Sequence, residues 1–251
     1  MSTKPANEVY SGEFFSGQAA GSARSAAVVV PRLLSLLQVR SVIDVGCGIG
    51  TWAAAFLANG IPDVLGVDGD YVDRSQLRIP KENFAARDLQ KPIRLDKTFD
   101  LAVCLEVAEH LPESRASGLV DDLATLAPAV LFSAALPGQG GTHHLNEQYL
   151  SYWADFFSKH NFEGIDPIRP WIAGNASVEW FYQQNIVMFV APKHPLLDGG
   201  FPGAHSLIHP RLYDLARKLE LTTPRTLFRA LPGALRRSIR YHLGPKGKKF
   251  D

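Results

Sequence analysis

Short apolar runs alternate with helical patterns along most of the chain. The expected strands lie near residues 41–45, 63–68, 83–86, 99–105 and 129–135, and the expected helices near 50–59, 70–77 and 114–126. This alternation is typical of a parallel sheet with helices on both faces. Ligands of such sheets bind beyond the carboxyl ends of the strands, so the loops that follow the strands are where a site is expected.

The flanking segments extend this pattern. Apolar spacing predicts a helix over 24–38, which Pro31 should kink or restart. Residues 146–160 carry an apolar stripe at helical spacing, and 161–165 and 184–191 predict the last two strands. We therefore predict an α/β fold: a Rossmann-like sheet of seven mostly parallel strands with helices on both faces.

The composition narrows the number of domains and the kinds of binding site that the chain can have. A chain of 251 residues with 46% hydrophobic and 20% charged residues suits one α/β domain with additions. The net charge of +1 gives no general reason to expect nucleic acid. Two cysteines, Cys47 and Cys104, are too few for a disulfide framework or a zinc site. Because no leader or membrane-length apolar run is visible, we expect a soluble, cytoplasmic protein with no membrane span.

Three parts are expected along the chain. Residues 1–40 form an N-terminal cap and helix, 41–192 the ligand-binding domain, and 193–251 a basic C-terminal extension with two helices over 211–241. The aromatic residues of 1–20 fit either a disordered arm or a cap that folds over the ligand. The extension fits a solvated tail or a dimer arm, or a phosphate-binding surface.

A glycine-rich turn follows the first expected strand. Residues 41–50 read Ser-Val-Ile-Asp-Val-Gly-Cys-Gly-Ile-Gly. Glycines let the backbone approach a ligand closely, and the next helix offers unpaired N–H groups. A dinucleotide fingerprint would need glycine where Thr51 stands, and Asp44 would repel a pyrophosphate. The acid suits instead the ammonium group of an amino acid moiety.

Acids also stand at later strand ends. Asp68 ends the second strand, where a carboxylate can accept hydrogen bonds from ribose hydroxyls. Asp88 can accept from an exocyclic amine, and the backbone N–H of Leu89 can serve a ring nitrogen. Glu106 leads the polar loop after the fourth strand.

Together, these segments resemble the class I S-adenosylmethionine-dependent methyltransferases over roughly residues 40–136. The resemblance implies that the domain over 41–192 binds S-adenosylmethionine. It also implies that Gly46 and Gly48 flank the methionine part, that Asp68 holds the ribose, and that Asp88 and Leu89 meet the adenine. The expected cofactor-binding residues are Asp44, Gly46, Cys47, Gly48, Asp68, Gly69, Asp88, Leu89 and Glu106.

A glycine-rich loop with two histidines follows the fifth expected strand. Histidine is suited to proton transfer at neutral pH. Residues 144–148 show the His-apolar-Asn-Glu-Gln pattern of bacterial small-molecule and glycan O-methyltransferases. This resemblance makes His144 the expected general base and His143 the second choice, with His110 as a rival. The alternative is that both histidines only pin the loop.

The long segment 166–183 is rich in aromatic residues beside amides and charges. Such a surface suits a polyhydroxylated ligand, because rings stack on its C–H faces and polar groups bond its hydroxyls. The expected substrate-binding residues are Trp171, Asn175, Trp180 and Tyr182. Alternatively, the aromatic residues pack the loop down or form a homodimer interface.

The sequence thus predicts methylation of a sugar or oligosaccharide hydroxyl, as in polysaccharide biosynthesis. Some related sugar enzymes use magnesium, but no carboxylate triad here assigns metal ligands. Two alternatives remain open. One is methylation of a secondary-metabolite hydroxyl or amine, and the other is nucleic-acid binding by the basic C-terminus.

Overall fold

The computed structural model describes residues 12–222, which fall into two units, one ending at His209 and one beginning at Pro210. The described part of the second unit is the helix α8 (Pro210–Thr222). The second helix expected in the C-terminal extension, most of its basic residues and the first part of the N-terminal cap lie outside the described residues. Between residues 12 and 222, no helix combines the length and apolarity that a membrane crossing requires.

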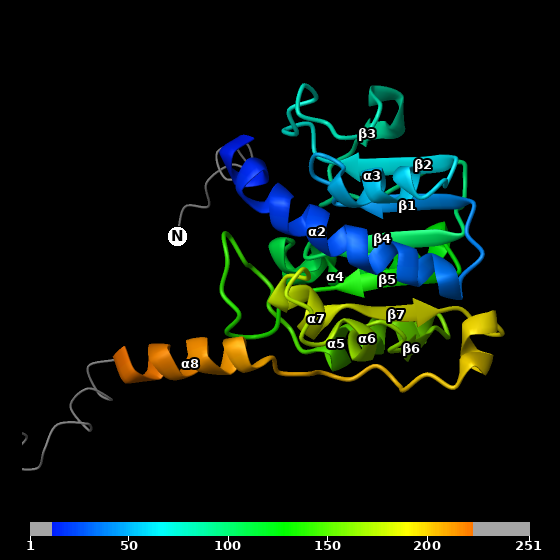
Figure 1. Cartoon of the computed structure of the whole chain (residues 1–251). Helices are drawn as coiled ribbons and strands as arrows, with labels where there is room; N and C mark the ends of the chain where they lie inside the picture. Colours follow the sequence, from blue (N-terminus) through cyan, green and yellow to red (C-terminus); the bar gives the residue numbers. More distant parts are fainter. Residues whose placement is uncertain (1–11, 223–251) are drawn as a thin grey trace, which may run out of the picture. The chain divides into compact units, whose positions relative to one another are not determined.

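The first unit is built on one seven-stranded sheet with the order β3-β2-β1-β4-β5-β7-β6 (Figure 1). The strands are β1 (Ser41–Val45), β2 (Asp63–Asp68), β3 (Phe84–Ala86), β4 (Leu101–Leu105), β5 (Ala129–Ser133), β6 (Glu163–Ile165) and β7 (Val187–Val190). Strand β7 pairs antiparallel with both β5 and β6, and all other pairs are parallel. The predicted seven-stranded, mostly parallel sheet is therefore confirmed.

Helices cover both faces of the sheet. One face carries α2 (Gly12–Leu36), α3 (Thr51–Ala58), α6 (Arg169–Ile172) and α7 (Trp180–Asn185), and the other carries α4 (Ala116–Leu126) and α5 (Leu150–Lys159). Side chains of a strand alternate between the faces: Val42 joins the core under α2 and α3, while Ile43 joins the core under α4 and α5. Because both faces are buried, the central strands are continuous apolar runs.

Three expected helices differ from those observed. Residues 70–77 form turns, because Asp73 accepts hydrogen bonds from the backbone N–H and the hydroxyl of Ser75, which compete with a helix. The helix expected at 146–160 begins only at Leu150. Helix α2 runs through Pro31 without the restart that was one of the two expected outcomes, and the buried side chains on either side of the proline hold it against the sheet.

The long segment between β6 and β7 is folded rather than open. It contains α6 and α7, and its anchor is the buried guanidinium of Arg169. Arg169 Nε donates to Asp166 Oδ2 at 2.9 Å, and Nη1 donates to the carbonyl of Gln184 at 2.9 Å. Short 3-10 helices complete the unit: η1 (Lys81–Asn83), η2 (Ala108–His110), η3 (Glu113–Arg115) and η4 (Pro195–Gly199).

Candidate active site

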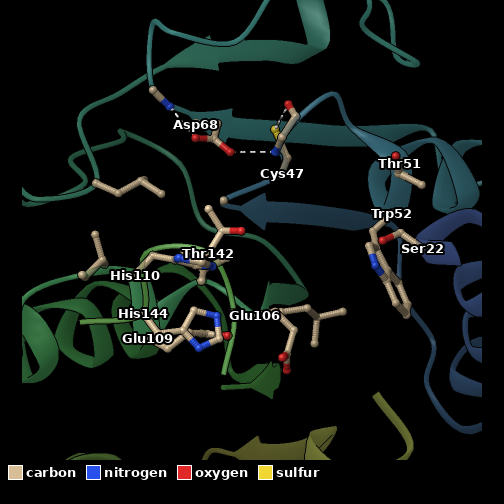
Figure 2. Close-up of a pocket in the computed structure, with 18 of the residues that line it drawn as sticks. Ser22, Cys47, Thr51, Trp52, Asp68, Glu106, Glu109, His110, Thr142 and His144 are labelled. Carbon is tan, nitrogen blue, oxygen red and sulfur yellow. Dashed lines mark hydrogen bonds between the residues drawn. The ribbon is translucent and has the colours of Figure 1, made fainter. Parts of the chain in front are cut away.

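A cavity of about 870 Å³ opens beyond the carboxyl ends of β1, β2 and β4 (Figure 2). Its volume lies in the upper part of the range for small-molecule sites. Most residues expected from the sequence line it: Gly46, Cys47, Gly48, Asp68, Gly69, Asp88, Leu89, Glu106, His144, Trp180 and Tyr182. The parallel topology thus brings strand ends that are far apart in sequence to one wall.

The turn after β1 requires glycine at position 46, because of both its backbone conformation and its packing. Gly46 has φ +79°, a left-handed conformation that other residues adopt only with strain. A Cβ at this position would lie 2.3 Å from Cγ2 of Val107. The turn is therefore pressed against the segment that follows β4, which leaves no room for a side chain.

Replacing Gly46 with alanine should cost roughly 2–5 kcal/mol, because left-handed strain and overpacking act together. Gly60 is the matched control: its φ is +84°, but a Cβ there would meet nothing within 4 Å. Gly60→Ala should therefore cost only about 1–2 kcal/mol. Thermal unfolding of the two variants measures the difference in stability. Equal losses of stability would show that the side chain of Val107 moves aside without cost.

Asp68 is a buried carboxylate that is held in place at the cavity wall. Its Oδ2 accepts from the N–H of Gly48 at 2.7 Å, and its Oδ1 accepts from the N–H of Gly69 at 2.6 Å and from the hydroxyl of Tyr71 at 2.5 Å. Burial raises the pKa of Asp68 despite these donors. Tyr71 had no signal in the sequence that would mark it as a partner.

Asp44 does not face the cavity as the sequence had indicated. Its Oδ2 accepts a hydrogen bond from the N–H of Ala53 at 3.2 Å, and only 3% of its surface is exposed. Burial raises the pKa of Asp44 to about 7, and the nearby Asp68 adds to that rise. The observed contact makes Asp44 a brace between β1 and α3 and gives no direct contact with the cavity.

The segment after β3 is fixed by a buried arginine that the sequence analysis missed. Arg115 Nε donates to the carbonyl of Leu89 at 2.8 Å, and Nη2 donates to that of Lys91 at 3.0 Å. Arg115 also forms a short ion pair with the buried Asp122. Asp88 lines the cavity next to this segment, and its Oδ1 accepts from the N–H of Gln90.

Glu106 lies at the centre of a network of amides. Its Oε2 accepts from Gln139 Nε2 at 3.0 Å, and its Oε1 accepts from Asn185 Nδ2 at 3.1 Å. Burial raises the pKa of Glu106, and these donors partly offset the rise. The partners are 33 and 79 residues away in sequence, so no local pattern could reveal them.

His144 reaches the cavity with a fixed ring orientation. Its Nδ1 lies 2.8 Å from Oε1 of Glu147, whose two oxygens accept from the N–H groups of Gly138 and Gly140. Its ring packs edge-on against that of His110, with ring centres 4.9 Å apart. The neighbouring His143 has φ +64° and does not line the cavity, so the structure separates the two expected bases.

The aromatic residues expected to bind the substrate also separate into those that line the cavity and those that do not. Trp180, Phe181 and Tyr182 line the cavity, and the hydroxyl of Tyr182 accepts from Trp52 Nε1 at 3.1 Å. Trp171 does not line it: half of its surface is exposed, and the guanidinium of Arg32 lies over its ring. Asn175 is likewise off the cavity, and its Oδ1 accepts the N–H of Ser177.

The chain belongs to a methyltransferase family, because residues 20–174 match the family model for a methyltransferase domain. The match and the observed fold, which solved O-methyltransferases share, place it among the class I S-adenosylmethionine-dependent methyltransferases. None of the curated proteins compared with the chain matches it.

Solved structures show the same fold at low sequence identity. A putative O-methyltransferase from Nostoc punctiforme has a TM-score of 0.52 at 12% identity, over 71% of this chain and 58% of that one. An O-methyltransferase family protein from Burkholderia thailandensis has 0.51 at 11%, over 71% and 57%. Streptomyces venezuelae DesVI has 0.50 at 14%, over 76% and 100%. The chain thus spans little more than half the length of the first two proteins.

Proposed function

We propose that this enzyme transfers the methyl group of S-adenosylmethionine to a hydroxyl of a sugar or oligosaccharide. The observation that carries the proposal is His144, which lines the same cavity as Asp68 (Figure 2) and whose Nδ1 lies 2.8 Å from Oε1 of Glu147. One cavity is thus lined both by a carboxylate that can accept hydrogen bonds from ribose hydroxyls and by an imidazole that can accept a proton.

In this proposal the cofactor lies along the ends of β1, β2 and β3. The turn at Gly46 and Gly48 borders its methionine part, and Asp68 accepts from its ribose hydroxyls. The segment at Asp88 and Leu89 borders the adenine. The support is that all five residues line the same cavity and come from adjacent strand ends.

Methyl transfer is an in-line displacement. The acceptor oxygen forms a bond to the methyl carbon, and the carbon–sulfur electron pair stays on sulfur. The hydroxyl proton passes to Nε2 of His144, and the carboxylate of Glu147 stabilises the resulting imidazolium through Nδ1–H. Placement of the two reactants can supply on the order of 7–11 kcal/mol, and the base contributes roughly 10²- to 10⁴-fold.

Trp180 and Phe181 supply the apolar faces on which a sugar ring can stack. Trp180→Ala should raise the KM for the acceptor about tenfold and leave cofactor affinity unchanged. Trp171→Ala is the matched control, since its ring lies off the cavity and should not affect either value. Steady-state kinetics with each variant separates the two. An equal effect of both substitutions would contradict the placement of the acceptor.

The acceptor class is tested by a screen with labelled cofactor. Transfer to a mono- or oligosaccharide supports the proposal. Transfer only to flat aromatic metabolites, or to amines, would overturn it and leave the cofactor site standing.

A further inference from the structure

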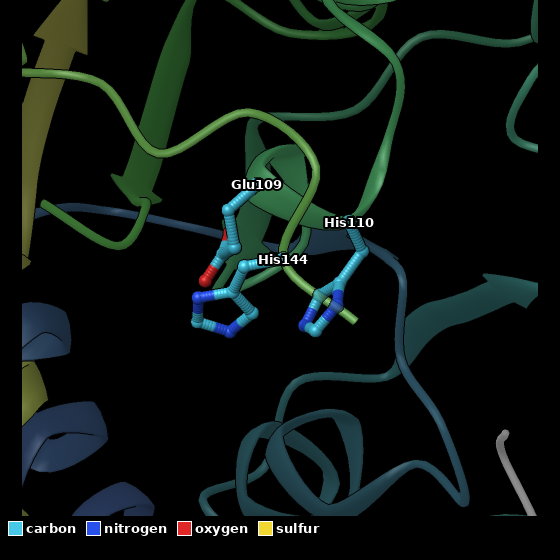
Figure 3. Close-up of side chains that lie close together, drawn as sticks. All are labelled: Glu109, His110 and His144. Atoms are coloured by element: carbon cyan, nitrogen blue, oxygen red, sulfur yellow. The ribbon is translucent and has the colours of Figure 1, made fainter. Parts of the chain in front are cut away.

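A cluster of three side chains beside the cavity is not explained by a cofactor site. Glu109, His110 and His144 each offer one ligand atom, and these atoms lie within 4.8 Å of one another (Figure 3). All three residues line the cavity. One carboxylate oxygen and two imidazole nitrogens form a donor set typical of a transition-metal site with open positions.

Glu109 provides a second, independent observation. Its side chain is fully buried, and neither carboxylate oxygen has a hydrogen-bond partner among the described residues. No lysine or arginine of the described ranges forms an ion pair with it. A buried carboxylate without compensation is costly, so this group needs a positive charge or a proton.

The environment of Glu109 is negative. Burial is the main reason that its pKa is raised well above the ordinary value, and the nearby Glu106 and Glu147 raise it further. The backbone N–H groups of Glu109 and Ala135 point toward the carboxylate and offset part of this rise, but neither of them reaches hydrogen-bond geometry with it. A cation in the cluster would stabilise the charged carboxylate, with the two imidazoles as its neutral ligands.

The backbone holds the three donors together. Glu109 and His110 are neighbours in η2, and the N–H groups of Leu145 and Asn146 donate to the carbonyl oxygen of Glu109 at 2.7 and 3.0 Å. These bonds tie the loop that carries His144 to η2. Metal bonds of about 2.0–2.2 Å place ligand atoms roughly 3 Å apart, so small side-chain rotations complete the site.

We propose that Glu109, His110 and His144 bind a divalent transition-metal cation, which holds the acceptor hydroxyl for methylation. With Nδ1–H donated to Glu147, Nε2 of His144 carries the lone pair for the cation, an arrangement common among metal-bound histidines. Two imidazoles beside one carboxylate favour Fe²⁺ or another first-row transition metal over Mg²⁺ and Ca²⁺, which prefer oxygen ligands, and Mn²⁺ serves as a spectroscopic probe of such a site.

This inference rests on the proposed function and changes one part of it. His144 becomes a ligand, since the same lone pair cannot also accept the substrate proton. The cation lowers the pKa of the hydroxyl that it holds, and the proton passes to solvent water. The oxygen then attacks the methyl carbon as before. Neighbouring hydroxyls of a sugar can fill two open positions.

The test is a titration of the full-length, EDTA-treated protein with Mn²⁺, followed by the electron paramagnetic resonance signal of the free ion. The wild type should bind one Mn²⁺ per chain. Glu109→Gln keeps the shape of the side chain and removes its charge, and it should weaken Mn²⁺ binding by more than about 100-fold. Glu113→Gln is the matched control, because Glu113 is exposed and should bind as the wild type does. Circular dichroism verifies that each variant is folded.

The outcomes separate the two proposals. Absence of saturable Mn²⁺ binding by the wild type would overturn the metal site, and so would unchanged binding by Glu109→Gln. Full methyl transfer to a sugar in EDTA would also overturn it, while supporting His144 as the base. Mn²⁺ binding that depends on Glu109, combined with no transfer to any sugar, would leave the site standing and refute the acceptor.

Discussion

Replacing His144 with alanine is expected to lower methyl transfer by roughly 100- to 10,000-fold and to leave cofactor affinity unchanged. The ring lies on the cavity wall, and its Nδ1 is hydrogen-bonded to Glu147. Nε2 is therefore the nitrogen that remains to accept a proton or to bind a cation. Single-turnover rates with labelled cofactor measure the loss, and calorimetry with S-adenosylhomocysteine measures the affinity.

A second histidine provides the control for this prediction. His160 Nε2 is hydrogen-bonded to Oδ1 of Asp121 at 2.7 Å, and this residue does not line the cavity. The His160→Ala variant should therefore transfer methyl groups at the wild-type rate. Unchanged turnover in His144→Ala would remove this residue from the mechanism. A parallel loss of cofactor affinity would instead show that His144 supports the cofactor.

Asp68→Asn should weaken cofactor binding by about 100-fold. A charged carboxylate that accepts from the ribose hydroxyls contributes roughly 1.5–3 kcal/mol per hydrogen bond, and each 1.4 kcal/mol corresponds to a factor of ten. The amide keeps the size of the side chain but has one oxygen and no charge. The turnover number at saturating cofactor should change much less than the dissociation constant.

Asp63 begins the same strand and is the matched control for Asp68. Its carboxylate is partly exposed, pairs with Lys97 and lies at the opposite end of β2. Asp63→Asn should bind the cofactor as the wild type does. If Asp68→Asn bound the cofactor normally, the ribose would have to lie elsewhere in the cavity.

The sheet could be predicted because its signals are local. The central strands are apolar on both sides, and a parallel sheet collects their ends at one edge, so acids at 68, 88 and 106 were expected together. The topology shows these residues on one cavity. Their assignment to parts of the cofactor stays a prediction.

Side-chain direction and distant partners could not be predicted. Asp68 ends β2 and lines the cavity, whereas Asp44 lies one residue before the end of β1 and accepts from the N–H of Ala53 in α3. Trp171 and Trp180 look alike in sequence, but only the fold of the segment after β6 shows which ring reaches the cavity. A buried carboxylate without partners, such as that of Glu109, is visible only once the surroundings are known.

The direction of β7 determines where a working fragment of this enzyme can end. Because β7 runs opposite to β5, its start lies beside the end of β5, and Asn185 reaches Glu106 there. The family match stops at residue 174, before this strand. A protein shortened to that boundary would expose the edge of β5 to aggregation and deprive Glu106 of one amide. A working fragment therefore extends at least through Val190.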